Sequence, residues 1–168
     1  SLRVLIAAGG TGGHVFPALS LGEEIREQFP DSEILFIGTN RGLEDRVIPQ
    51  AGFSLKTISM SGWVRSFSPL DMVRNFWMPF KLFFGMMQSL FILRRFRPHV
   101  AIGCGGYVTG PVIWLAAQMK IPTLIQEQNS RPGRTTLMLS KFVDEVHLTY
   151  EEARSEEHTS ELQALRQL

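Results

Sequence analysis

Near its amino terminus the chain carries the sequence RVLIAAGGTGGHVFPAL, residues 3–19. The apolar run at residues 3–8 is typical of a buried parallel strand, and the glycine cluster after it is typical of a loop. Helical spacing then joins the apolar residues Phe16, Leu19, Leu21, Ile25 and Phe29. The sequence therefore predicts a strand, a glycine-rich turn and a helix, in which the turn lets a ligand approach the main chain closely.

The rest of the chain continues this alternation of strands and helices. The further expected strands are residues 33–37, 53–59, 99–102, 122–125 and 144–148. The further expected helices are residues 43–50, a long helical region after the loop at residues 60–69 that runs to about residue 96, a helix after a second glycine cluster at residues 103–107, and residues 132–142. Such alternation predicts an α/β fold, a Rossmann-like doubly wound parallel sheet. The common strand order 3-2-1-4-5 would bring both glycine clusters to one crevice.

Length and composition limit the possible functions. With 168 residues, 44% of them hydrophobic, the chain has room for one globular domain. A net charge of +1 argues against a nucleic-acid partner. A single cysteine, Cys104, and the lack of a signal peptide favour a cytoplasmic location. The most apolar stretch, residues 82–93, is too short and too interrupted to span a membrane.

The first glycine cluster excludes several kinds of nucleotide site. It does not complete the dinucleotide-binding pattern, because Val15 stands at the third glycine position and no acid ends the second strand. A phosphate loop that ends in Gly-Lys-Ser or Gly-Lys-Thr is also missing, and nothing has the spacing of metal ligands. His14 lies at the expected crevice, where an imidazole could serve as a general base. The alternative is that His14 only packs or caps the start of the helix.

Three motifs in a fixed order resemble the signature loops of the MurG family. They are Gly9 to Pro17, Gly105 to Pro111, and Glu127 to Gly133. The resemblance covers roughly residues 3–153 and implies the N-terminal half of a two-domain GT-B glycosyltransferase, with residues 1–153 as the acceptor-binding domain and the C-terminal donor domain missing. The family is an inverting hexosyltransferase that moves N-acetylglucosamine from UDP-N-acetylglucosamine to lipid I, undecaprenyl-pyrophosphoryl-MurNAc-pentapeptide, and so forms lipid II for peptidoglycan. It implies no cofactor, no metal and a peripheral location on the cytoplasmic face of the cell membrane, and the isolated half is expected to be inactive.

The expected site combines the physical reasoning with this resemblance, and His14 is its catalytic base. The expected contacts to the acceptor pyrophosphate are Gly9, Gly10, Gly105, Gly106, Tyr107 and Glu127. The resemblance adds donor-side contacts at Thr11, Gly12, Gly13 and Asn129. Tyr107 could cover the pyrophosphate with its ring or could simply pack. The chain departs from the family at Gln126, where histidine is usual, and at Thr136, where asparagine is usual.

The segment from residue 65 to residue 97 is both basic and aromatic. This segment contains six basic residues and one acidic residue, Asp71. One stripe is expected to pack on the sheet, namely Phe76, Phe80, Phe83, Met87 and Phe91. A membrane patch that suits an anionic lipid surface is expected at Trp77, Phe80, Lys81, Phe84, Arg94 and Arg95. The alternatives are a thick core helix or a helix that the second domain covers.

Residues 154–168 are expected to be an artefactual tail, because residues 154–163 resemble the translation of a widely used sequencing adapter. The alternative is a genuine polar amphipathic helix. Two other functions stay open on the sequence: a membrane-bound acceptor subunit of a split glycosyltransferase, and an unrelated nucleotide-binding oxidoreductase. The missing acid after the second strand already argues against the oxidoreductase.

Overall fold

The computed structural model describes residues 1–60 and 76–149. The strands are β1 Arg3–Ala7, β2 Glu33–Gly38, β3 Ser54–Thr57, β4 Val100–Gly103, β5 Thr123–Glu127 and β6 Glu145–Leu148. The helices are α1 Gly12–Gln28, α2 Glu44–Gln50, α4 Met78–Phe96, α5 Thr109–Gln118 and α6 Arg134–Leu139. The predicted alternation is confirmed. The expected tail at residues 154–168 and the loop at residues 61–69 lie outside the described residues.

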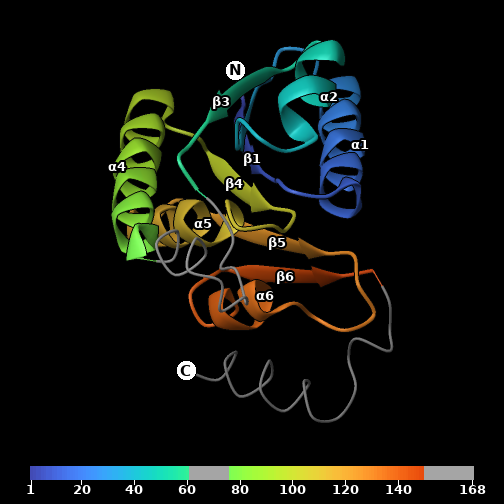
Figure 1. Cartoon of the computed structure of the whole chain (residues 1–168). Helices are drawn as coiled ribbons and strands as arrows, with labels where there is room; N and C mark the ends of the chain where they lie inside the picture. The colour runs from blue at the N-terminus through green and yellow to red at the C-terminus, as the bar shows by residue number, and fades with distance from the viewer. Residues whose placement is uncertain (61–75, 150–168) are drawn as a thin grey trace.

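The strands form one parallel sheet in the order β3-β2-β1-β4-β5-β6 (Figure 1). The predicted neighbours β1 and β4 pair along their length, with Ala7 opposite Gly103. Because both strands run in the same direction, the glycine clusters that follow them start side by side. The doubly wound α/β fold predicted from the sequence is therefore confirmed.

Each face of the sheet has its own apolar core. Side chains alternate along a strand, so Val4 and Ile6 of β1 point to one face while Leu5 and Ala7 point to the other. The first face is covered by α1 and α2, and the second by α4, α5 and α6, as the ribbon shows for α1 and α2 against α4 and α5 (Figure 1). The result is a three-layer domain that leaves the carboxyl edge of the sheet to the loops.

The inner face of α4 differs from the expectation. The stripe of Phe76, Phe80, Phe83, Met87 and Phe91 was expected against the sheet, yet all of these side chains are exposed. The helix instead buries Gly85, Ser89 and Leu93, one turn apart. A side chain at Gly85 would meet Met60 and the Ser59 carbonyl, so small residues let the helix come close to the domain. The prediction that the phenylalanine stripe packs on the sheet is therefore wrong. The close approach of the helix to the domain, more than the hydrophobicity of its residues, selects the buried face.

Candidate functional site

The two glycine clusters meet at the carboxyl ends of β1 and β4. The Gly9 N–H donates to the carbonyl of Gly105 at 3.3 Å. Gly105 and Gly106 adopt φ values of +107° and +87°, a region that favours glycine. A side chain at Gly106 would collide with the Gly9 carbonyl, and one at Gly105 would collide with the His14 imidazole. Glycine is therefore needed in the second cluster so that the two loops and His14 can come together.

A hydroxyl inside the domain fixes the second glycine loop. Thr109, the first residue of α5, is buried, and its hydroxyl accepts the Gly105 N–H at 3.1 Å. The same oxygen lies 2.9 Å from the Gly105 carbonyl and 3.1 Å from the Ala7 carbonyl of β1. Thr109 thus ties the second loop to the strand that carries the first loop.

A buried carboxylate organises the first glycine loop. Glu44, at the start of α2, is fully buried and accepts hydrogen bonds from the Gly10 N–H at 3.1 Å and from the Thr39 N–H and hydroxyl at 2.9 and 2.8 Å. A side chain at Gly42 would collide with this carboxylate, and one at Gly38 would collide with the Cγ methylene of Glu44. The sequence analysis missed Glu44. The sequence does contain a signal for its burial: Glu44 lies one helical turn before Ile48 and therefore on the same, buried face of a short helix.

The amide groups of the crevice divide into engaged and free donors. The N–H of Gly9 and that of Gly10 already donate inside the protein. Within residues 1–60 and 76–149, the N–H groups of Gly12, Gly13 and Tyr107 have no hydrogen-bond acceptor. Free donors for a ligand therefore lie in the first turn of α1 and just before α5, at expected contact positions, whereas Gly9 and Gly10 offer no free N–H.

Glu127 organises the loop after β5. Its Oε1 accepts the Asn129 N–H and side-chain amide at 3.0 and 2.8 Å, and its Oε2 accepts the Gly133 N–H at 3.0 Å and the Thr136 hydroxyl at 2.6 Å. Burial acts to raise the pKa of Glu127, but the hydrogen bonds from Thr136, Gly133 and Asn129 outweigh it and lower the pKa below its ordinary value of 4.5. Glu127 is therefore an ionised carboxylate whose two oxygens are both occupied.

This geometry argues against a direct contact between Glu127 and a pyrophosphate, because an anion would meet a carboxylate that has no proton to donate. The loop instead presents Asn129, which is exposed and whose side-chain oxygen is not used by Glu127. Thr136, one of the departures from the family pattern, supplies the shortest of the bonds to Glu127. The other departure, Gln126, points to β6 and donates to the Thr149 hydroxyl at 3.0 Å.

His14 lies in the first turn of α1 and is half-buried. Its Nδ1 is 3.5 Å from Oε1 of Gln128, which lies in the loop after β5. Strand order therefore brings together three segments that are far apart in the sequence: the loops after β1, β4 and β5. The sequence analysis placed His14 at this crevice but did not identify Gln128.

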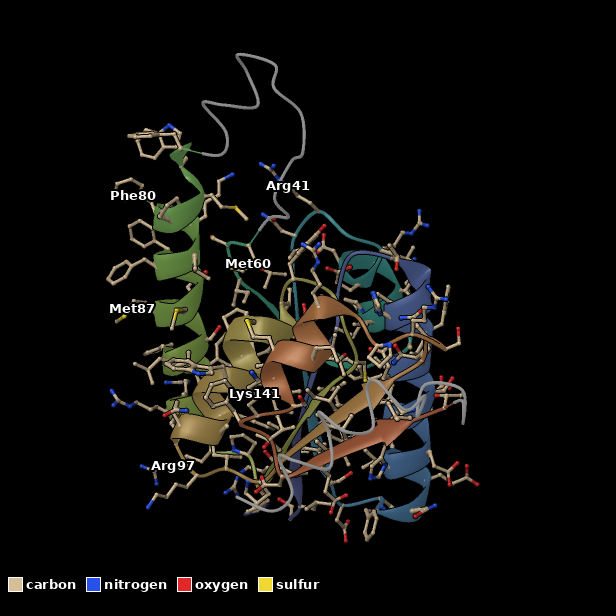
Figure 2. All side chains as sticks on the ribbon, turned by 90° about the horizontal axis from the view of Figure 1, so that it is seen from below. Arg41, Met60, Phe80, Met87, Arg97 and Lys141 are labelled. Atoms are coloured by element: carbon tan, nitrogen blue, oxygen red, sulfur yellow. The ribbon has the colours of Figure 1, made fainter. Side chains whose placement is uncertain are left out.

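The outer face of α4 is aromatic. Trp77, Phe80 and Phe84 are 53%, 51% and 59% exposed, and Arg94 and Arg95 are exposed in the last turn, whereas Lys81 is half-buried. Phe80 and Met87 point away from the rest of the domain (Figure 2). The expected patch and the stripe that was expected inside thus form one exposed aromatic face. Across residues 1–60 and 76–149, no helix is both long and apolar enough to cross a bilayer.

Metal or thiol chemistry has no support in the part of the chain that the structure describes. No group of His, Cys, Asp and Glu side chains there could hold a metal ion. Cys104 follows β4 directly but is buried, and burial raises the pKa of its thiol to about 12. The crevice itself offers main-chain N–H groups that can bind an anion and an imidazole, that of His14, that can accept a proton.

Known proteins resemble this chain in sequence and in fold. Residues 4–148 match the family model described as the glycosyltransferase family 28 N-terminal domain. The UDP-N-acetylglucosamine--N-acetylmuramyl-(pentapeptide) pyrophosphoryl-undecaprenol N-acetylglucosamine transferase of Clostridioides difficile (strain 630) is 45% identical over 152 residues, which cover 90% of this chain and 36% of the relative. The protein with the same description from Lactococcus lactis subsp. cremoris (strain MG1363) is 43% identical over 152 residues, which cover 90% of this chain and 42% of the relative.

The crystal structure of Acinetobacter baumannii MurG aligns with a TM-score of 0.74 and 28% identity, covering 89% of this chain and 42% of that one. The chain spans about two fifths of the length of these relatives. Its architecture is that of the N-terminal half of a GT-B glycosyltransferase. The match over residues 4–148, together with the two glycine loops of the crevice, shows that this chain belongs to glycosyltransferase family 28.

Proposed function

We propose that this chain is the acceptor-binding half of an enzyme that transfers N-acetylglucosamine from UDP-N-acetylglucosamine to lipid I and forms lipid II in peptidoglycan synthesis. The observation that carries the proposal is the pair of glycine loops that meet beside His14. The descriptions of the relatives supply the donor and acceptor, and the chain's two-fifths share of their length implies that the donor domain lies outside residues 1–168.

The acceptor pyrophosphate would lie at the N-terminus of α5. Gly105 and Gly106 shape this loop, and the free N–H of Tyr107 faces the anion together with the positive end of the helix dipole. An anion at a helix N-terminus gains about 0.3–1 kcal/mol from the dipole, and more where the site is partly buried. Gly9 and Gly10 would act by bringing the first loop close to the second, because their N–H groups are engaged.

The donor would approach from the side of α1 and the loop after β5. Thr11, Gly12 and Gly13 form the start of α1, where the last two have free N–H groups. Asn129 is exposed in the loop after β5, directly after Gln128, whose amide lies 3.5 Å from His14. Most donor contacts would come from the second domain. Glu127 would contribute by fixing the position of Asn129.

His14 would be the general base of the transfer. The attacking sugar hydroxyl would form a bond to the anomeric carbon of N-acetylglucosamine while the bond from that carbon to the UDP phosphate oxygen breaks. UDP then leaves with the bonding electrons, the configuration inverts, and the hydroxyl proton passes to His14. In a protein that joins this domain to a donor domain, His14→Ala should abolish transfer, and near-normal turnover would remove His14 as the base.

The exposed aromatic face of α4 would hold the domain on the cytoplasmic face of the membrane, where the undecaprenyl chain of the acceptor is anchored. Aromatic side chains suit the headgroup boundary, and each nearby cation adds about 1 kcal/mol on an anionic surface. Arg94 and Arg95 are exposed at the end of the helix, and no ion pair with an acid among the described residues neutralises either of them.

Calorimetric titration of this chain tests the acceptor assignment. A soluble lipid I analogue should bind, whereas UDP-N-acetylglucosamine and an analogue without the pyrophosphate should bind poorly. Tyr107→Ala should weaken binding of the lipid I analogue about fivefold, equivalent to roughly 1 kcal/mol for an aromatic contact. The control Phe142→Ala, which removes an exposed ring after α6, should leave this binding unchanged. Equal affinity for the analogues with and without pyrophosphate would overturn the proposal.

A split enzyme is the second candidate, in which this chain is a separate membrane-bound acceptor subunit. The limited share of the relatives that the chain covers is compatible with it. Clean sequence of the gene beyond codon 153 distinguishes the two. An open frame that continues into a second Rossmann-like domain favours a fragment of one enzyme, and a stop codon favours a split subunit.

A further inference from the structure

The environment of the His14 ring is set by a neutral side chain. Nδ1 of His14 lies 3.5 Å from Oε1 of Gln128, at the outer limit for a hydrogen bond. Such distances are common for catalytic pairs before a substrate binds. Gly105 also lies next to Nδ1, where the lack of a side chain leaves room for the ring. Gln128 is therefore the side chain that the structure places at Nδ1.

A second bond fixes which end of the Gln128 amide faces the histidine. Its Nε2 donates to the main-chain carbonyl of Gln126 at 3.0 Å. A carbonyl oxygen can only accept, so the amide nitrogen must face Gln126 and the amide oxygen must face His14. Because the amide oxygen can also only accept, it favours the imidazole tautomer that carries its proton on Nδ1.

We infer that Gln128 is a positioning residue that keeps the proton of neutral His14 on Nδ1 and leaves the lone pair of Nε2 free. The inference rests on the proposed role of His14 as the base, because a base needs one unprotonated nitrogen directed at the attacking hydroxyl. An orienting partner at the other ring nitrogen is how such a base obtains its tautomer. The partner here is neutral, so it selects the tautomer without adding a negative charge to the crevice.

Nitrogen NMR of this chain, labelled with 15N in its histidine rings, reads the tautomer directly. Protonated and unprotonated ring nitrogens resonate far apart, and the His14 signals are assigned by their loss in His14→Ala. At a pH at which the ring is neutral, Nδ1 of His14 should resonate as the protonated nitrogen and Nε2 as the unprotonated one. His147 is an internal reference of the opposite kind, because its Nε2 lies 2.8 Å from the Glu145 carboxylate, which can only accept.

Two glutamine variants separate the effect of the amide from a general disturbance of the loop. Gln128→Ala should shift His14 back to the Nε2–H tautomer that free histidine prefers. Gln126→Ala removes a side chain that bonds to Thr149 but keeps the carbonyl that orients Gln128, so it should leave the His14 spectrum unchanged.

The inference is overturned if wild-type His14 carries its proton on Nε2, or if Gln128→Ala leaves the Nδ1–H tautomer in place. Neither result depends on turnover. The role of His14 as the general base is rejected by a different result, namely near-normal transfer by the His14→Ala variant. The failure of one proposal can therefore be told apart from the failure of the other.

Discussion

Replacing Glu127 with glutamine should destabilise the domain, although the two side chains have the same shape. Each carboxylate oxygen accepts one backbone N–H, from Asn129 at Oε1 and from Gly133 at Oε2. A glutamine has only one oxygen. Whichever way its amide turns, the NH₂ group faces a backbone N–H at hydrogen-bond distance, and that partly buried donor is left without an acceptor.

The size of the effect follows from the bonds that change. An unsatisfied buried donor costs about 1–3 kcal/mol, and bonds to a charged acceptor are worth about 1 kcal/mol more than bonds to a neutral one. With Glu127 only 4% exposed, we expect Glu127→Gln to lower the free energy of unfolding by about 3 kcal/mol. That is a large part of the stability of an ordinary domain.

The effect should also depend on pH, with a sign set by the lowered pKa of Glu127. A carboxyl group whose pKa is lower in the folded state stabilises folding at any pH above its ordinary value, here 4.5. That contribution is lost as the pH falls below 4.5 and through the folded-state pKa. The stability gap between wild type and Glu127→Gln should therefore be widest at neutral pH and shrink in acid.

Urea unfolding of both chains, followed by circular dichroism at neutral and acidic pH, measures this gap. Glu145→Gln is the matched control, because Glu145 is exposed on β6 and its carboxylate lies 2.8 Å from the exposed imidazole of His147. Such a surface pair is worth about 0–1 kcal/mol. Equal stability of Glu127→Gln and wild type at neutral pH, or a gap that does not narrow in acid, would refute the reasoning.

Two further predictions concern the first glycine loop and α4. Glu44→Ala leaves two backbone N–H groups, those of Gly10 and Thr39, without an acceptor, and it should lower the free energy of unfolding by about 3 kcal/mol. The control Glu23→Ala, on the exposed side of α1, should change this free energy by less than about 0.5 kcal/mol. Urea titrations measure both changes. Trp77→Glu combined with Phe84→Glu should abolish sedimentation with anionic liposomes, while Phe29→Glu, at an exposed ring after α1, should not. Undiminished binding by the double variant would reject the membrane face.

Much of the fold could be predicted because its signals are local. The apolar runs at β1 and β4 and the glycine clusters after them mark strand ends wherever the strands lie in the sheet. The rules for parallel sheets then place β1 beside β4. The crevice and the position of His14 within it follow from the same reasoning, since a residue just beyond a central strand must lie at the carboxyl edge of the sheet.

The buried face of α4 could not be predicted, because aromatic or aliphatic residues cover more than one side of the helix. Counting hydrophobic residues favours the phenylalanine stripe as the inner face. The choice depends on Gly85, which lets the helix approach Ser59 and Met60, and that contact exists only when the chain is folded.

The amino-acid sequence by itself determined the sheet, its strand order and the meeting of two glycine loops beside His14, because strand propensity, turn residues and crossover handedness are local or general properties. Only the tertiary structure decided which donors remain free in the crevice. Glu44 takes the Gly10 N–H, and Glu127 is occupied by its own loop. Whether two groups form a hydrogen bond depends on their direction and on their distance to within a few tenths of an ångström. Both are set by the packing of segments that lie far apart in the sequence.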